Sequence, residues 1–76
     1  MAKTQRFKNL KEIKAFGKKV RSIRENLGYT QEQVAARAEV SFPTINRIEQ
    51  GHVNPRIDTV FSIADALKTD PHKLFE

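Results

Sequence analysis

The side chains best suited to chemistry in this chain are hydrogen-bonding groups crowded into ten residues, from Ser41 to Gln50. Ile45 and Ile48 recur there at helical spacing, so we expect both to face inward and the remaining positions to face outward. Two hydroxyls, two carboxamides and a guanidinium then share one surface. The outward positions are Ser41, Phe42, Pro43, Thr44, Asn46, Arg47 and Gln50. All five of these polar groups can donate or accept hydrogen bonds.

The usual catalytic and metal-binding patterns are missing from the sequence. No cysteine is present, which excludes disulfides, thiol catalysis and the common structural zinc sites. His52 and His72 lie far apart and show no metal-ligand spacing. Asp58 and Asp65 share a helix face, but nothing nearby supplies a nucleophile, a base or a pocket, which favours a solvated surface. We therefore expect no enzyme, no cofactor and no metal site.

Two short helices with a tight turn between them are predicted to position the polar surface. Thr30 and Gln33 have the spacing of a capping box at the start of the first helix. Ser41 can start the second helix, and Gly51 suits the left-handed position just past its end. The pattern predicts helices over about 31–38 and 42–50. This is the helix-turn-helix arrangement, over about 30–51, whose second helix enters a DNA major groove.

The pattern resembles the phage repressor and Cro type (XRE-like) of helix-turn-helix family, which also holds restriction-modification controllers and many antitoxins. The resemblance covers about 16–75. FGKKVRSIRENLGYTQ is similar to the family's first helix and Leu-Gly turn, and GHVNPRIDTVFSIADALKTDPHKLF to its loop and last two helices. Glu39 and Lys68 depart from it, because the family often has glycine there. A left-handed non-glycine residue costs about 1–2 kcal/mol, so either turn could differ locally.

Three further helices are expected outside this motif. One apolar stripe predicts a first helix that ends at Gly28, with Asn9 or an earlier residue as its cap; the stripe is Phe7, Leu10, Ile13, Phe16, Val20, Ile23 and Leu27. A fourth helix follows from Ile57, Val60, Ile63, Ala64 and Leu67. Asp70 and Pro71 predict the cap and first residue of a short fifth helix. The expected fold is all-α, a compact five-helix lambda-repressor-like domain without strands.

Size and charge suggest one domain with a basic start. The chain has 76 residues and a formal net charge of +5. Nine Lys or Arg and two Glu fall within residues 1–27, which favours either a phosphate-binding surface or a solvated helix face. We expect residues 1–8 to form a flexible basic arm and residues 9–76 the DNA-binding domain. No apolar run is long enough to span a membrane, and the N-terminus lacks a signal-peptide stretch, so a cytoplasmic location is expected.

The resemblance implies which residues approach base edges, namely Ser41, Phe42, Pro43 and Arg47. Arg47 could take guanine O6 and N7 together, worth about 1–3 kcal/mol of discrimination; the alternative is a solvated side chain or a phosphate contact. Phe42 and Pro43 could press on a thymine methyl group. Otherwise Phe42 folds into the core and Pro43 only fixes the helix start.

Other polar residues are expected to hold the DNA backbone or a base. Thr44 and Asn46 could reach either, with adenine as the base for Asn46. Gln31 begins a helix, where its side chain and free backbone N–H can bind a phosphate, although simple helix-start polarity is the alternative. The resemblance places Gln50, Asn54 and Arg56 beside the backbone too, and Arg56 could reach a narrow minor groove.

Two residue pairs have structural rather than DNA-binding interpretations. The resemblance implies a buried ion pair between Arg24 and Glu49 that ties the first helix to the third. Removing one partner of such a pair costs about 3–5 kcal/mol. Phe61 and Leu74 could form a dimer patch, with ordinary core packing as the alternative.

The whole pattern predicts a sequence-specific regulator that binds double-stranded DNA as a homodimer on a palindromic operator, with two recognition helices about 34 Å apart. Control would come from protein concentration and dimerisation, including binding at its own promoter. The alternative is an antitoxin that neutralises a toxin with its extended first helix or basic arm and also binds DNA. A protein partner, either a toxin or RNA polymerase, is not readable from the sequence, nor is activation as against repression.

Overall fold

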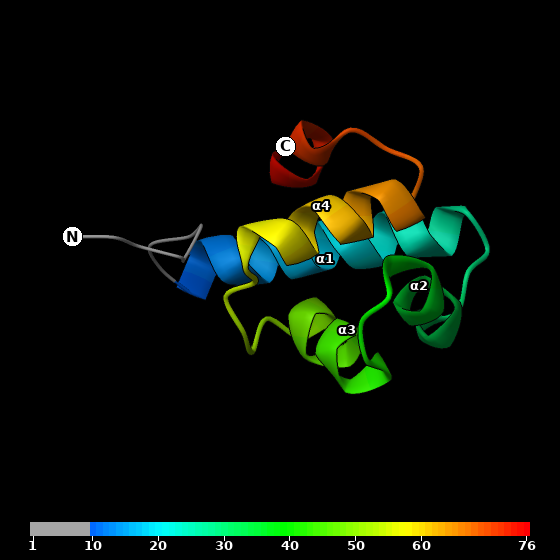
Figure 1. Cartoon of the computed structure of the whole chain (residues 1–76). Helices are drawn as coiled ribbons and strands as arrows, with labels where there is room; N and C mark the ends of the chain where they lie inside the picture. The colour runs from blue at the N-terminus through cyan, green and yellow to red at the C-terminus, as the bar shows by residue number, and fades with distance from the viewer. Residues whose placement is uncertain (1–9) are drawn as a thin grey trace.

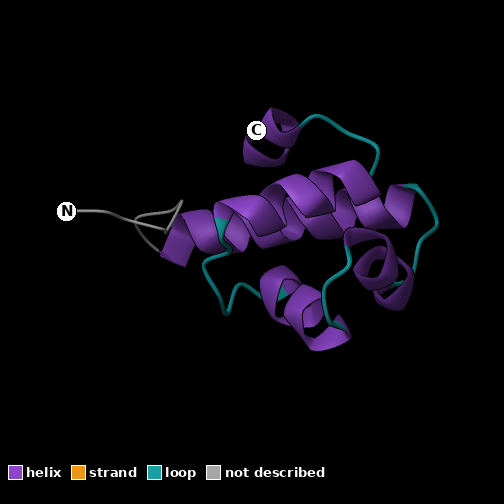
Figure 2. Ribbon diagram, in the orientation of Figure 1, coloured by secondary structure: helices purple, strands orange, loops and turns teal. Residues whose placement is uncertain are grey.

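A computed structural model of the chain describes residues 10–76, and helices are the only regular elements found there (Figures 1 and 2). The expected arm at residues 1–8, Phe7 and the Asn9 cap lie outside the described residues. The elements, in chain order, are α1 (Leu10–Asn26), α2 (Gln31–Ala38), α3 (Phe42–Glu49), α4 (Ile57–Ala66) and the 3-10 helix η1 (Pro71–Phe75).

The last element corrects the expectation of five α-helices, because η1 is a 3-10 helix of only five residues. Proline stands in its first turn as predicted, but the side chain of Asp70 makes no capping hydrogen bond. Short 3-10 pieces are common where a chain turns without room for a second helical turn. Residues 10–76 therefore form four α-helices closed by a 3-10 turn, and that turn brings Leu74 to the core.

The core lies where the apolar stripes of the helices meet. Its largest fully buried side chains are Val20, Val34, Ile45, Ile48, Val60, Ile63, Leu67 and Leu74. The predicted stripes extend beyond it, since Leu10, Leu27 and Ile57 are exposed. These residues lie in the first turn of α1, just past its end and in the first turn of α4. Helix ends reach past the layer that covers their middle, so periodicity overestimates burial there.

A close approach between α1 and α3 fixes the position of α3. A Cβ atom added to Gly17 would collide with the backbone carbonyl oxygen of Ile48 and lie 3.0 Å from that of Glu49. Glycine lets two backbones meet where any other side chain would separate them. Figure 1 shows α2 and α3 on one side of α1 and η1 on the other, and α1 contacts both α3 and η1.

Both positions where the family often has glycine take the left-handed conformation. Glu39, after α2, has φ 59°, and Lys68, after α4, has φ 58°. Each turn closes with backbone hydrogen bonds of the kind that end helices: Val40 N donates to Ala35 O at 3.0 Å, and Thr69 N to Ala64 O at 3.0 Å. The chain thus keeps the expected turn geometry and carries a backbone strain in each turn that glycine would relieve.

Candidate nucleic-acid interface

The start of each helix in the α2–α3 pair is capped by its own side chains. Thr30 Oγ1 accepts from Gln33 N at 3.1 Å, and Gln33 Oε1 accepts from Thr30 N at 2.8 Å, which completes the predicted capping box. Ser41 Oγ accepts from Thr44 N at 3.2 Å and lies 2.7 Å from the Thr44 hydroxyl. The two hydroxyls proposed as DNA contacts thus also fix the first turn of α3.

The outer face of α3 is divided as its periodicity predicts. Ile45 and Ile48 are buried, and Pro43 and Arg47 are exposed. The ring of Phe42 is 43% exposed, so it does not fold back into the core. The first two turns of α3 therefore expose an aromatic ring, a proline and a guanidinium to solvent.

Arg24 and Glu49, the residues expected to pair, form a two-pronged ion pair between α1 and α3. Arg24 Nε donates to Glu49 Oε2 at 2.7 Å, and Arg24 Nη2 donates to Glu49 Oε1 at 3.0 Å. The side chains are 12% and 3% exposed. Arg24 Nη1 also donates to the carbonyl of Tyr29 at 2.9 Å. The hydrogen bond to Glu49 raises the pKa of the Arg24 guanidinium above its ordinary value, so the guanidinium stays charged.

The ion pair continues into a chain of three carboxamides. Gln31 Nε2 donates to Glu49 Oε1 at 2.9 Å. Asn46 Nδ2 donates to Gln31 Oε1 at 3.2 Å, and Gln50 Nε2 donates to Asn46 Oδ1 at 2.9 Å. Sequence reasoning treated these amides as separate DNA contacts and missed that they bond to one another. The available signal was the spacing of positions 46, 49 and 50, which places all three on one face of a helix.

The remaining phosphate candidates lie where α3 gives way to α4. Asn54 is half-buried in the loop. Arg56 is the N-cap residue of α4, and its Nε lies 3.5 Å from Asp58 Oδ1. Both of these side chains are exposed, and such a pair contributes little stability. Lys14, which sequence reasoning did not single out, packs its stem on the end of α3: a Cβ on Gly51 would lie 2.6 Å from Lys14 Cγ.

The suggested dimer patch needs one correction. Leu74 is 1% exposed and belongs to the core of the single chain, so it cannot form such a patch with Phe61. Phe61 itself is 54% exposed on α4. Ile57, one turn earlier on the same helix face, is exposed too. The apolar surface of α4 is therefore Ile57 and Phe61.

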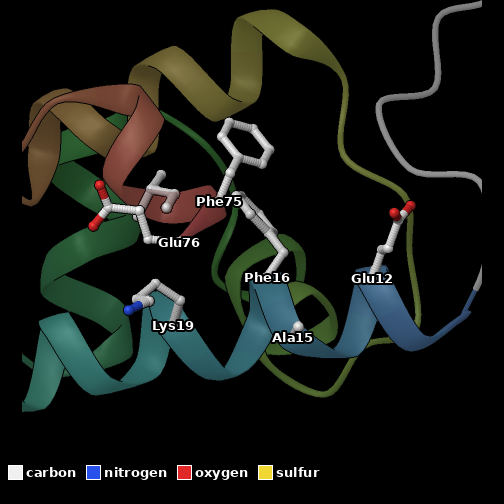
Figure 3. Close-up of a pocket in the computed structure, with 7 residues that line it drawn as sticks. Glu12, Ala15, Phe16, Lys19, Phe75 and Glu76 are labelled. Carbon is white, nitrogen blue, oxygen red and sulfur yellow. The ribbon is translucent and has the colours of Figure 1, made fainter.

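A hollow of about 290 Å³ lies between α1 and the C-terminus. Figure 3 shows Phe16 and Phe75 facing each other there, and their ring centroids are 5.6 Å apart. The hollow is lined by Glu12, Ala15, Phe16, Lys19, Leu74, Phe75 and Glu76. These residues do not pair a nucleophile with a base.

Within residues 10–76, no three histidine, cysteine or carboxylate side chains are grouped to hold a metal. None of the helices described is both long and apolar enough to cross a membrane.

The two-helix motif falls within a match to a known protein family. The sequence matches the family HTH_3, Helix-turn-helix, over residues 20–74. It is 29% identical over 58 residues to the HTH-type transcriptional regulator DdrOP3 of Deinococcus deserti. That stretch covers 76% of this chain and 45% of the relative, so the chain spans less than half of the relative's length.

Two solved structures have closely similar folds. The restriction-modification controller protein C.AhdI from Aeromonas hydrophila superimposes with a TM-score of 0.84 and 26% identity, covering 86% of this chain and 98% of the controller. The P22 c2 repressor in complex with a synthetic operator superimposes with a TM-score of 0.75 and 23% identity, covering 80% and 92%. The family match spans most of the chain and includes both helices of the motif. The chain therefore belongs to the HTH_3 helix-turn-helix family of XRE type, a family of DNA-binding transcriptional regulators.

Proposed function

We propose that this protein is a sequence-specific regulator of transcription that binds a palindromic operator on double-stranded DNA as a homodimer. The observation that carries the proposal is the outer face of α3, where Phe42, Pro43 and Arg47 are exposed on a helix held rigidly by Gly17 and by the Arg24–Glu49 pair. A positioned helix that exposes a guanidinium for hydrogen bonds and apolar groups for methyl contacts suits readout in a major groove.

Base recognition is assigned mainly to the exposed part of α3. The guanidinium of Arg47 can donate two hydrogen bonds to guanine O6 and N7. Phe42 and Pro43 lack hydrogen-bonding side chains, and they suit contact with a thymine methyl group. Ser41 and Thr44 bond to each other in the cap, and a hydroxyl engaged in this way can still accept or donate one further bond to a base or phosphate.

Phosphate contacts would lie beside this reading surface. The first turn of α2 brings backbone N–H groups and the Gln31 carboxamide to a helix N-terminus, which favours an anion. Gln50, Asn54 and Arg56 follow at the C-terminal end of α3. Lys14 joins them, because its stem packs at the point where α3 ends. Gln31 bonds to Asn46 and Glu49, so these phosphate contacts all lie near the C-terminal end of α3, and together they would fix the register of the helix in the groove.

Dimerisation is assigned to α4. Ile57 and Phe61 are exposed on one face of this helix. A domain of 76 residues buries a modest core, so covering these side chains with a second copy would also stabilise it. A twofold dimer through α4 would set two copies of α3 about 34 Å apart on successive major grooves.

The regulated gene is proposed to include the protein's own. The Aeromonas hydrophila protein with 26% identity is a restriction-modification controller. We propose that this chain likewise controls transcription, and that it does so in the cytoplasm. A regulator that binds its own promoter adjusts its concentration through occupancy alone. The antitoxin alternative depends on the extended first helix or on the basic arm at residues 1–8; the arm lies outside the described residues, and nothing in residues 10–76 favours that alternative.

Selection of binding sites from a random duplex pool, followed by sedimentation of the complex, tests the proposal. We expect an inverted repeat with half-sites about 10 base pairs apart, a stoichiometry of two chains per site, and a matching site upstream of the protein's own gene. Recovery of sequences without any shared motif would contradict sequence-specific binding. One chain per selected site would contradict the dimer.

A further inference from the structure

A chain of hydrogen bonds links the side chains of Glu49, Gln31, Asn46 and Gln50. Glu49 determines which atom of each amide donates and which accepts. Glu49 is paired with the guanidinium of Arg24, and a carboxylate in such a pair only accepts hydrogen bonds. Gln31, at 2.9 Å, must therefore turn its amino group toward Glu49. A reversed carboxamide would place a carbonyl oxygen against the carboxylate, with no proton between them.

The orientation of Gln31 then decides that of the next amide. Its carbonyl oxygen faces Asn46, which donates Nδ2 to it at 3.2 Å. The carbonyl of Asn46 accepts in turn from Gln50 Nε2 at 2.9 Å. Exposure increases along the chain: Glu49 is buried, Gln31 and Asn46 are half-buried, and Gln50 is exposed. The buried ion pair thus dictates amide orientations at the protein surface.

Both functional atoms of the Asn46 side chain are engaged with protein, the amino group as donor and the carbonyl as acceptor. Pairing with adenine would need this carbonyl and amino group to turn together toward one base edge, which would break the bonds to Gln31 and Gln50. Asn46 and Gln31 each keep a second amide N–H. Only Gln31 stands in the first turn of α2, where the helix dipole also favours an anion.

We propose that Asn46 is a positioning residue that reads no base: it holds the Gln31 carboxamide so that the second N–H of Gln31 donates to a DNA phosphate. This inference rests on the proposed DNA-binding function and replaces the expectation that Asn46 contacts adenine. Base reading on α3 is left mainly to Phe42, Pro43 and Arg47, with Ser41 and Thr44 able to add one hydrogen bond each.

The amide arrangement is tested first without DNA, by NMR on the full chain labelled with ¹³C and ¹⁵N. We expect scalar couplings across the hydrogen bonds from Gln31 Nε2 to the carboxylate carbon of Glu49 and from Asn46 Nδ2 to the amide carbon of Gln31. A coupling from Gln31 Nε2 to the amide carbon of Asn46, or the absence of both expected couplings, would overturn the proposal.

The role in binding is then tested by affinity and site selection for Asn46→Ala, Gln31→Ala and the double variant. We expect Asn46→Ala to weaken binding to the operator and to random duplex by the same factor, about three- to tenfold, and to select the wild-type motif. In a Gln31→Ala background, Asn46→Ala should add less than a twofold loss, because the two residues act through one contact. Arg47→Ala is the matched control on the same helix, and its selected motif should lose one base preference.

Three results would overturn this part of the proposal. These are a changed base preference in the motif selected by Asn46→Ala, losses that multiply in the double variant, and unchanged affinity in Asn46→Ala. A wild-type protein that bound no DNA would instead contradict the proposed function. The NMR couplings would still decide the amide arrangement, so the two failures are distinguishable.

Discussion

The helices α3 and α4 are of similar length and both bury an apolar stripe, yet their outer surfaces differ in chemistry. The exposed side of α3 carries Phe42, Pro43, the cation Arg47 and amides linked to a buried ion pair, whereas that of α4 carries Ile57, Phe61 and two aspartates. Carboxylates on α4 would repel phosphates, and its apolar side chains suit a protein surface. Under the proposed function, DNA recognition and self-association are therefore assigned to separate helices of one small domain.

The largest effect on stability is expected from Glu49→Ala. The position of α3 depends on the buried Arg24–Glu49 pair, whereas the position of α4 does not. The change leaves the Arg24 guanidinium buried without its partner, so the free energy of unfolding should fall by about 3–5 kcal/mol. Urea denaturation measures it. A loss below about 1 kcal/mol would show that α3 is held by packing alone. DNA binding by this variant should be compared only under conditions in which it is folded.

Replacing Arg47 with alanine tests the chemistry assigned to α3. Removal of the guanidinium should weaken binding to the selected operator by about 1–3 kcal/mol and weaken binding to random duplex much less. Titrations on both duplexes at one salt concentration measure the difference. Equal losses on the two would mean that Arg47 contacts phosphate.

Substituting Phe61 with alanine tests the chemistry assigned to α4. Phe61 would be buried in the proposed dimer, and losing that burial costs about 1.5–3 kcal/mol. The dimer dissociation constant, measured by analytical ultracentrifugation, should therefore rise tenfold or more. Leu27→Ala is the matched control, since Leu27 is also an exposed apolar residue but lies outside α4. If both variants dimerise like the wild type, the interface lies elsewhere; if both are impaired, it extends beyond α4.

The smallest effects are expected in the turns that end α2 and α4. Glu39→Gly and Lys68→Gly should each raise the free energy of unfolding by about 1 kcal/mol, because glycine takes a left-handed conformation without the steric penalty. Thermal unfolding of each variant checks this. Unchanged or lower stability in either would mean that the side chain makes compensating interactions or that the turn differs from the one described.

Much of the α2–α3 unit could be predicted from the sequence because its signals are local. The capping box at Thr30, the cap at Ser41 and the inward isoleucines all act within a few residues, and the helices occur where these patterns indicate. The fifth helix was mispredicted because an Asp-Pro start shows where a helix can begin and does not show how long it continues.

The errors and omissions concern contacts between distant parts of the chain. The dimer patch with Leu74 was wrong because η1 folds back against α1 and α4 and buries that residue, as the alternative of core packing expected. The requirement for glycine at position 17 depends on the carbonyls of Ile48 and Glu49, some thirty residues later. The carboxamide chain joins α2 to α3 through side-chain geometry. Residue types and spacing identified the candidate functional residues. The contacts that these residues make with distant parts of the chain could be identified only from the folded structure.

The most direct test of the central claim is the affinity of the wild-type protein for its selected operator compared with a scrambled duplex, measured by fluorescence anisotropy at two salt concentrations. The account predicts a preference of about a thousandfold or more, with random-duplex binding falling steeply as salt rises. Equal, weak and salt-sensitive binding to the two duplexes would contradict it.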